Sequence, residues 1–197
     1  MDRRIYLIRH GKIQMGREKR YIGITDLPLN AEGINQGKKL HDYFSNITIE
    51  KVYTSPLIRC VQTSEIIIGN RNIKSLLVEE LKEINMGDWE EKSFEYIKKR
   101  FPDQYENRGK HIDTFKVPGG ESFYQLYKRV IPVFEELIKI TQGNILIVAH
   151  AGVNRVILSK LLGFSLQEIM NISQPYGCVN ELFWDSLYQK WQCKTVG

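Results

Sequence analysis

The stretch Ile5-Tyr6-Leu7-Ile8-Arg9-His10-Gly11 decides the fold of this 197-residue chain. Its four apolar residues predict a short buried strand, which ends abruptly in a cation, an imidazole and a glycine. In open α/β sheets, ligands bind at the carboxyl edge of the strands, so the stretch delivers Arg9 and His10 to such an edge. Gly11 allows the backbone to turn close to a ligand, because glycine has no Cβ. Alone, the tripeptide does not distinguish a ligand site from an ordinary polar strand end.

A second apolar run, over residues 144–149, ends in the same way, with His150 followed by two small residues. A further strand over 51–54 leads into Ser55-Pro56, and serine followed by proline is a typical helix start. This start places Arg59 in the first turn of the helix, close to the carboxyl edge of the preceding strand. Cations are mildly disfavoured at a helix amino terminus, so a basic residue there invites a functional explanation. An arginine that simply faces solvent is the alternative.

Two imidazoles and two guanidiniums would then meet at one edge of the sheet, and together they indicate a site for a phosphate dianion. Guanidinium groups such as Arg9 and Arg59 bind phosphoryl oxygens through two parallel hydrogen bonds and stay charged at any working pH. A histidine acts as a nucleophile when its other ring nitrogen is hydrogen-bonded, and a second, protonated histidine neutralises phosphoryl charge. A carboxylic acid is still needed to protonate the leaving oxygen. The loop after the third strand offers Glu79, Glu80 and Glu83.

The remaining chain alternates strands with helices, which predicts one doubly wound α/β domain over residues 1–197, with a mainly parallel sheet. Strands are expected over 5–8, 51–54, 73–78, 144–149, 178–184 and 191–195. Helices are expected from Asn30 to 44 and over 55–68, 93–101, 123–138, 153–162 and 165–171. Pro132 should kink or split the long helix, and Gly143 should close it. The irregular, polar residues from 103 to 120 indicate a covering segment, so that about 84–120 would form an excursion over the sheet edge.

Composition excludes several classes of protein. With 42% hydrophobic and 26% charged residues, the chain is typical of a folded domain rather than of a disordered one. No stretch approaches the ~20 apolar residues of a transmembrane span, and the first apolar run is too short for a signal peptide, so we expect a cytoplasmic protein. Cys60, Cys178 and Cys193 form no Cys-x-x-Cys pair, which argues against a disulfide framework or a structural zinc site. The net charge of +5 includes no basic block, so neither nucleic acid nor a membrane is expected as a partner.

The segment from 12 to 29 is long and polar, and so long a loop inside a compact domain is usually functional. Its cations could steer an anionic substrate towards the site. These cations are Lys12, Arg17, Lys19 and Arg20. Trp89, beside the acidic loop, is expected either to line the pocket or to pack in the core.

The chain resembles the histidine phosphatase (phosphoglycerate mutase-like) superfamily in three segments: Leu-Ile-Arg-His-Gly at 7–11, Tyr-Thr-Ser-Pro-Leu-Ile-Arg-Cys-Val-Gln-Thr at 53–63, and Val-Ala-His-Ala-Gly-Val-Asn-Arg at 148–155. Further landmarks of that family match at 23–30, 87–90 and 118–122. The resemblance extends over nearly the whole chain. It implies a three-layer α/β/α fold with a mainly parallel central sheet and a small covering segment.

The resemblance also implies roles for individual residues. His10 would be the nucleophile that becomes phosphohistidine, and Glu83 would protonate the leaving group and then act as base. Arg9, Arg59 and His150 would form the phosphate pocket. Contacts to the substrate are implied for Gly11, Gln14, Gly16, Ile22, Gly23, Ala151 and Gly152. The resemblance implies neither a metal nor another cofactor.

The chain departs from the family pattern after Arg-His-Gly. Many relatives carry an asparagine at the position that Gly16 occupies here. A polar side-chain contact to the phosphate would therefore be missing or supplied elsewhere, and Gln14 is the candidate substitute.

Within the superfamily, the segments 20–29 and 174–180 are similar to those of α-ribazole phosphatases, which remove phosphate from α-ribazole 5′-phosphate during assembly of the cobalamin nucleotide loop. Sugar-phosphate mutases of the superfamily are usually longer. The alternatives are a broad-specificity phosphatase, a phosphoglycerate mutase-type enzyme and, from another class, a non-catalytic phosphate-binding module. The expected partner is a small phosphorylated metabolite, and the oligomeric state is left open.

Overall fold

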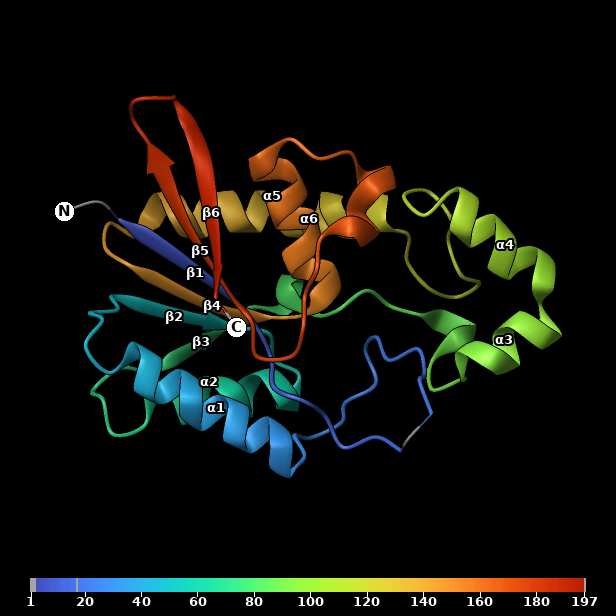
Figure 1. Cartoon of the computed structure of the whole chain (residues 1–197), viewed down its shortest axis with the longest axis horizontal. Helices are drawn as coiled ribbons and strands as arrows, with labels where there is room; N and C mark the ends of the chain where they lie inside the picture. Colours follow the sequence, from blue (N-terminus) through green and yellow to red (C-terminus); the bar gives the residue numbers. More distant parts are fainter. Residues whose placement is uncertain (1–2, 17, 197) are drawn as a thin grey trace.

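A computed structural model describes residues 3–16 and 18–196, and its centre is a six-stranded sheet in the order β3-β2-β4-β1-β5-β6 (Figure 1). The strands are β1 (Arg4–Arg9), β2 (Lys51–Thr54), β3 (Ser75–Leu77), β4 (Ile145–Ala149), β5 (Val179–Asp185) and β6 (Lys190–Val196). Strands β3, β2, β4 and β1 pair in parallel, whereas β5 and β6 are antiparallel to their neighbours. The mainly parallel sheet that the sequence predicts is therefore confirmed.

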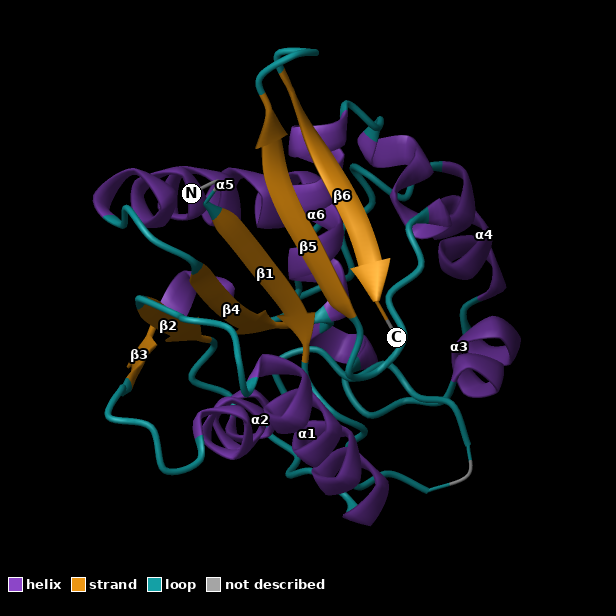
Figure 2. Ribbon diagram, turned by 60° about the vertical axis from the view of Figure 1, so that its left-hand side comes forward, coloured by secondary structure: helices purple, strands orange, loops and turns teal. Residues whose placement is uncertain are grey.

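Helices cover both faces of the sheet, as Figure 2 shows. One face carries α1 (Ala31–Phe44) and α2 (Ile58–Ile68), and the other carries α5 (Phe123–Ile140) and α6 (Ala151–Leu162). Successive side chains of a strand point to opposite faces, so Ile5 and Leu7 join the apolar cluster under α5 and α6, whereas Tyr6 and Ile8 join the cluster under α1 and α2. This alternation of wholly apolar residues produces the three layers of the α/β/α fold.

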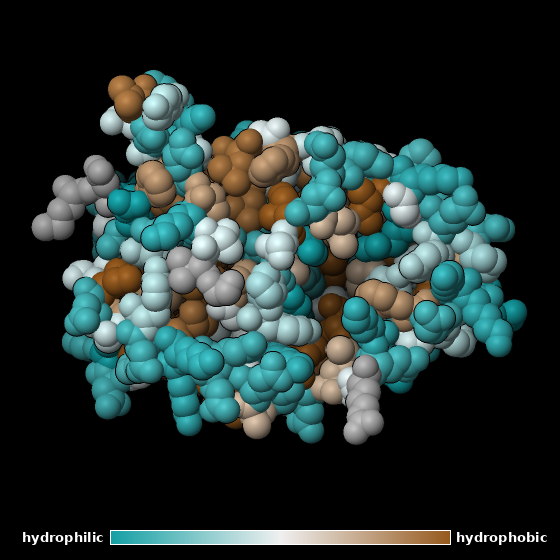
Figure 3. Space-filling view, viewed as in Figure 1, coloured by the Kyte–Doolittle hydropathy of each residue, from teal (hydrophilic) through white to brown (hydrophobic). Residues whose placement is uncertain are grey.

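Two further helices lie beyond the carboxyl ends of the parallel strands (Figure 1). They are α3 (Phe94–Arg100) and α4 (Pro102–Lys110). In Figure 3 the mostly hydrophilic surface is hollowed between the sheet and the end of the molecule that carries them. The prediction of an irregular segment from residue 103 to residue 120 is wrong in its first part, because α4 extends to Lys110. Helix α4 buries none of its residues, so it has no apolar periodicity to detect, and Pro102 starts it because the first helical position needs no N–H donor.

Other expected boundaries also shift. The predicted helix start at Ser55-Pro56 is wrong by two residues, because Leu57 is the residue before α2 and Ser55 Oγ instead accepts a hydrogen bond from Leu57 N (3.3 Å). Arg59 nevertheless lies in the first turn. Strand β3 is shorter than the predicted 73–78, because only its three residues pair with β2, at the edge of the sheet. The residues 166–171 form a 3-10 helix behind Ser165.

Pro132 does not split α5, which continues to Ile140. Pro132 lies on the exposed face of the helix, where a carbonyl that loses its helical partner can turn to water. Gly143 does not close the helix, because the helix ends at Ile140 with Thr141 as its C-cap. The Gly143 N–H instead donates to the Glu50 carboxylate. At the other end, Ser122 and Gln125 form a reciprocal capping box.

Candidate active site

The two predicted histidines meet at the carboxyl edge of the sheet. Arg9 and Ala149 are paired residues at the ends of β1 and β4, so the residue after each, His10 and His150, leaves the sheet at the same level. Their ring centroids lie 5.1 Å apart, with an angle of 65° between the planes. The sequence prediction that both imidazoles share one edge is confirmed.

The His10 ring is oriented by its own backbone turn. Its Nδ1 lies 2.7 Å from the Gly11 carbonyl oxygen, and since a carbonyl only accepts, Nδ1 carries the proton. The other ring nitrogen, Nε2, therefore keeps its lone pair. The side chain is only 4% exposed. This is the arrangement of a histidine nucleophile whose tautomer is fixed by a hydrogen bond.

Arg59 is fully buried and joins the His150 ring to the loop 23–25. Its guanidinium donates to Gly23 O (2.6 Å) and Thr25 O (2.8 Å), and its Nε donates to His150 Nδ1 (3.3 Å). With Nδ1 accepting, the proton of His150 lies on Nε2, which donates to the Ser55 hydroxyl (2.8 Å). A solvent-facing Arg59 is therefore excluded. The guanidinium has five N–H groups and uses three of them in these contacts, so two remain for a ligand.

Arg9 is held by a segment that sequence reasoning did not include in the site. Its Nη1 donates to Gln174 O, and its guanidinium lies 3.7 Å above the centre of the Tyr176 ring. Within the described part of the chain, the buried Arg9 Nε has no hydrogen-bond partner. Tyr176 also contacts the His10 ring, with centroids 5.6 Å apart. The sequence did contain one indication of this segment, namely its family likeness at 174–180. That likeness does not show which residue the segment contacts.

Of the three candidate acids, the structure places Glu83 at the site. Its Oε2 accepts from Gly152 N (3.0 Å), in the first turn of α6, the helix that His150 precedes. Its Oε1 accepts from Ile84 N (2.9 Å), and the side chain is 8% exposed. A Cβ on Gly152 would strike this carboxylate, so the close approach requires glycine. Glu79, by contrast, is exposed and pairs with Lys82. The contact of Glu80 with Arg129 is made by its backbone carbonyl, which accepts a hydrogen bond.

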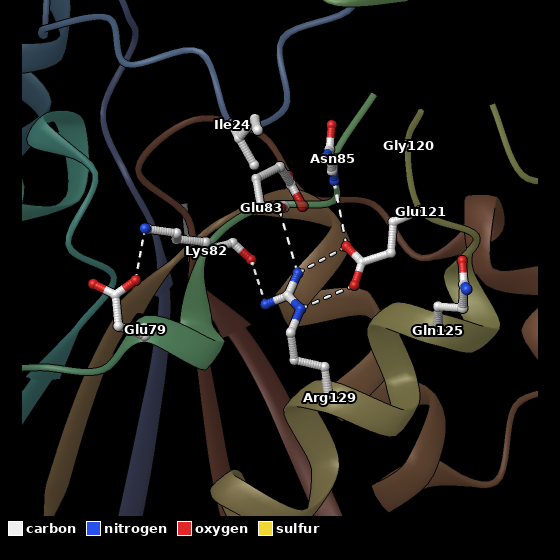
Figure 4. A pocket seen from close by; sticks show the side chains of 9 residues that line it. All are labelled: Ile24, Glu79, Lys82, Glu83, Asn85, Gly120, Glu121, Gln125 and Arg129. Atoms are coloured by element: carbon white, nitrogen blue, oxygen red, sulfur yellow. Dashed lines mark hydrogen bonds and ion pairs between the residues drawn. The ribbon is translucent and has the colours of Figure 1, made fainter. Parts of the chain in front are cut away.

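Glu83 also lines a cavity of about 380 Å³, which Figure 4 shows from close by. The charges in this cavity are largely paired. Arg129 binds both oxygens of Glu121 (2.9 Å each), and Lys82 pairs with Glu79 (2.6 Å). The cavity is also lined by Ile24, Asn85, Gly120 and Gln125. The cavity therefore lies beside the Glu83 carboxylate and is lined mainly by polar residues whose charges are largely paired.

The other predicted contact positions differ in how they are placed. Gly11 N is already bonded to the Thr63 hydroxyl (3.1 Å). Ile22 and Ala151 are half-buried, and Gly16 lines a second cavity beside Tyr176. Gln14 is exposed, and its side chain makes no hydrogen bond within residues 3–16 and 18–196. A contact of Gln14 with bound phosphate thus stays a prediction. Trp89 is only 1% exposed and belongs to the core, where it packs beside Tyr21 and Phe115.

Burial and the two arginines suppress protonation of both histidines. The pKa of His10 is lowered well below 6.5, chiefly by desolvation and then by the positive charges of Arg59 and Arg9. The pKa of His150 is lowered in the same way by desolvation and by Arg59. Both rings are therefore neutral at pH 7. A bound phosphate dianion would oppose these effects, because its negative charge favours the imidazolium.

We expect the free energy of unfolding to decrease as the pH falls below 6.5, because the unfolded imidazoles then take up protons that the folded ones resist. Above pH 6.5 this contribution to stability is fully present. The ring C–H signals of His10 and His150, followed by NMR, should titrate with midpoints below pH 6.5. Addition of phosphate should move these midpoints to higher pH. A midpoint at or above 6.5 for either ring in the free protein would contradict this expectation.

The second cavity, of about 570 Å³, lies next to Tyr176 and is lined by three cations and by Glu18. Arg20 pairs with Glu18 (2.9 Å) and Lys12 pairs with Glu32 (2.5 Å), so the cations keep a net excess of positive charge only through Lys19. Lys12, Lys19 and Arg20 line it, while Arg17 lies outside the described residues. We expect kcat/KM for an anionic substrate to fall several-fold as the salt concentration rises, because these cations steer the anion over distances that salt screens. Steady-state rates from about 0.02 to about 0.5 M salt, over which the Debye length falls from roughly 20 Å to roughly 4 Å, measure this effect. A kcat/KM that is independent of salt would exclude steering.

No group of three or more His, Cys, Asp and Glu side chains within the described residues is arranged to hold a metal ion. Within the same residues, no helix has both the length and the apolar character that a membrane crossing requires. The three cysteines are free thiols.

Comparison with known proteins identifies the family. A family model of the histidine phosphatase superfamily (branch 1) matches residues 5–197. The chain is 28% identical over 178 residues to the adenosylcobalamin/alpha-ribazole phosphatase of Escherichia coli (strain K12), which covers 89% of this chain and 87% of that protein. It is 31% identical over 183 residues to the 6-phosphofructo-2-kinase/fructose-2,6-bisphosphatase of Gallus gallus, over 91% of this chain but only 37% of that protein.

Among solved structures, the alpha-ribazole phosphatase from Shigella flexneri has a TM-score of 0.88 and 25% identity, over 98% of this chain and 95% of that chain. The fold, the paired histidines and the family match over nearly all residues agree with one another. The chain therefore belongs to branch 1 of the histidine phosphatase superfamily and is a phosphoric monoester hydrolase.

Proposed function

We propose that the enzyme hydrolyses phosphate monoesters through a phosphohistidine formed on His10. The observation that carries this proposal is the hydrogen bond from His10 Nδ1 to the Gly11 carbonyl. This bond leaves the lone pair on Nε2, and the charges of Arg59 and Arg9 act on the same ring. A module that only binds phosphate has no need of a nucleophile with a fixed tautomer and a buried acid at one site. The non-catalytic alternative is therefore disfavoured.

The first step transfers the phosphoryl group to the protein. His10 Nε2 attacks phosphorus, the bond to the ester oxygen breaks, and Glu83 donates its proton to that oxygen so that an alcohol leaves. Arg9 and the two unused N–H groups of Arg59 bind the phosphoryl oxygens. His150 neutralises further charge when the dianion favours its protonation at Nδ1, a step that releases the hydrogen bond from Arg59 Nε.

The second step returns the free enzyme. Glu83, now a carboxylate, takes a proton from water, and the water oxygen attacks the phosphorus of phosphohistidine. The N–P bond breaks, orthophosphate leaves, and Glu83 is again protonated for the next cycle. Each proton that Glu83 donates is thus recovered, and no metal ion is required.

We propose α-ribazole 5′-phosphate as the substrate. Support comes from the curated relatives of Escherichia coli and Salmonella typhimurium, whose names include alpha-ribazole phosphatase, and from the family likeness at 174–180, the segment that holds Arg9. The cavity beside Glu83 offers a polar space for the leaving group. The likeness to the Gallus gallus bisphosphatase favours a second candidate, a sugar phosphate.

Phosphate release from α-ribazole 5′-phosphate, compared with sugar phosphates, nucleotides and 3-phosphoglycerate in the presence of EDTA, tests the proposal. A preference of about a hundredfold in kcat/KM, equal to about 2.7 kcal/mol in transition-state binding, would establish the ribazole ester. Similar rates on all esters would indicate a broad-specificity phosphatase. Faster interconversion of phosphoglycerates than release of phosphate would indicate a mutase, and no turnover of any ester would favour a binding module.

A further inference from the structure

The Glu90 carboxylate fixes the backbone of the loop 23–25. It accepts hydrogen bonds from Gly23 N (3.1 Å), Ile24 N (2.9 Å), Thr25 N (3.3 Å), Thr25 Oγ1 (2.6 Å) and Met86 N (3.0 Å). Three successive backbone N–H groups thus converge on one carboxylate, an arrangement that in other proteins forms a binding site for free anions. Hydrogen bonds to an ionised acceptor are stronger than neutral ones, so the loop is firmly anchored.

The same loop supplies the carbonyls that bind Arg59. Gly23 and Thr25 offer their N–H groups to Glu90 and their oxygens to the guanidinium, at 2.6 and 2.8 Å. Arg59 in turn reaches His150 through Nε. We infer that Glu90 is a positioning residue that sets the geometry of Arg59, and so of the phosphate pocket. This inference rests on the proposed function.

The close packing around the loop supports this role. A Cβ on Gly23 would strike both the Ile84 carbonyl and the Glu90 carboxylate, so the loop can approach Glu90 only with glycine at this position. The loop is also fixed on its other side, because Asp26 Oδ1 accepts a hydrogen bond from Ile58 N (2.7 Å), at the start of α2. Arg59 follows directly in that helix. The loop therefore lies between Glu90 and the helix that carries Arg59, and a change at Glu90 reaches the guanidinium.

The substitution Glu90→Gln keeps the size of the side chain but replaces one of the two acceptor oxygens with an NH₂ group, which only donates. Each carboxylate oxygen accepts from at least two donors, so either orientation of the amide places an NH₂ group against N–H groups. The loop should move away, and Arg59 should lose its acceptors. We expect the dissociation constant for orthophosphate, measured by calorimetry, to rise at least about tenfold, and KM for p-nitrophenyl phosphate to rise in parallel.

Three matched variants separate positioning from a general loss of structure. In an Arg59→Ala background, Glu90→Gln should change phosphate binding by less than about twofold, because the residue through which it acts is gone. Asp88→Asn, an exposed carboxylate two residues away, should leave phosphate binding unchanged. Glu90→Asp retains both oxygens and should recover part of the affinity, including where Glu90→Gln folds poorly.

Several results would overturn the inference. It fails if Glu90→Gln binds orthophosphate as wild type does, or if the substitution weakens binding equally with and without Arg59. It also fails if kcat alone falls, in proportion to the folded fraction in thermal unfolding, while KM and phosphate affinity stay constant. Failure of the proposed function is distinguishable, since a wild-type protein that binds orthophosphate but forms no phosphohistidine would overturn only the catalytic assignment.

Discussion

Replacement of His10 by alanine is expected to lower kcat/KM for p-nitrophenyl phosphate at least about a thousandfold, because no other group of the site is placed to accept the phosphoryl group. The His10 ring has its lone pair at Nε2 and is close enough to feel the charges of Arg59 and Arg9, whereas His150 Nε2 is engaged with Ser55. Incubation with labelled ester should give an acid-labile, base-stable phosphoenzyme in the wild type and none in the variant.

The fold should survive this change. His10 is buried but belongs to neither of the apolar clusters that hold the helices on the sheet. Thermal unfolding and circular dichroism verify this, and His10→Asn, which retains a polar side chain, guards against a collapse of the site. His111→Ala, on the exposed surface, is the matched control and should keep full activity. Residual activity of His10→Ala within about tenfold of wild type would refute nucleophilic catalysis by this residue.

The second large effect is expected for Glu83→Gln, and it depends on the leaving group. An alkyl phosphate needs its oxygen protonated as it departs, so its kcat/KM should fall at least about a hundredfold. Nitrophenolate leaves without much protonation, so p-nitrophenyl phosphate should lose no more than about tenfold. Steady-state rates on both esters, with the same enzyme preparation, measure the difference directly.

Glu79→Gln is a suitable control for the acid assignment. Glu79 lines the same cavity, but its carboxylate is exposed and paired with Lys82, so both esters should be hydrolysed at the wild-type rate. Glu83 also accepts hydrogen bonds from Gly152 N and Ile84 N, so the variant needs a check of thermal stability. An equal decrease in kcat/KM for the alkyl and the nitrophenyl ester would show that Glu83 has a structural role and is not the general acid.

The part of the site that lies on the strands could be predicted from the sequence. An apolar run that ends in His10, and a second that ends in His150, are local patterns, and the geometry of parallel strands brings their ends to one edge. Arg59 was predictable for the same reason, since its helix starts where a neighbouring strand ends. The layers of helices follow from apolar strands that must be covered on both faces, whereas the order of the strands in the sheet comes from the structure.

The contacts that only the tertiary structure decided join residues that no local pattern connects. Local patterns left three acids open, and only the resemblance to the superfamily pointed to Glu83. The tertiary structure supplies the physical contact, because the amino terminus of α6, far along the chain, presents Gly152 N to the Glu83 carboxylate. The helix α4 has no apolar face, so its sequence resembles a loop. Glu90 contacts the loop 23–25 across 65 to 67 residues of chain. Hydrophobic periodicity indicates whether a side chain faces the core. Which residue that side chain contacts there depends on the packing of segments that are distant in the sequence.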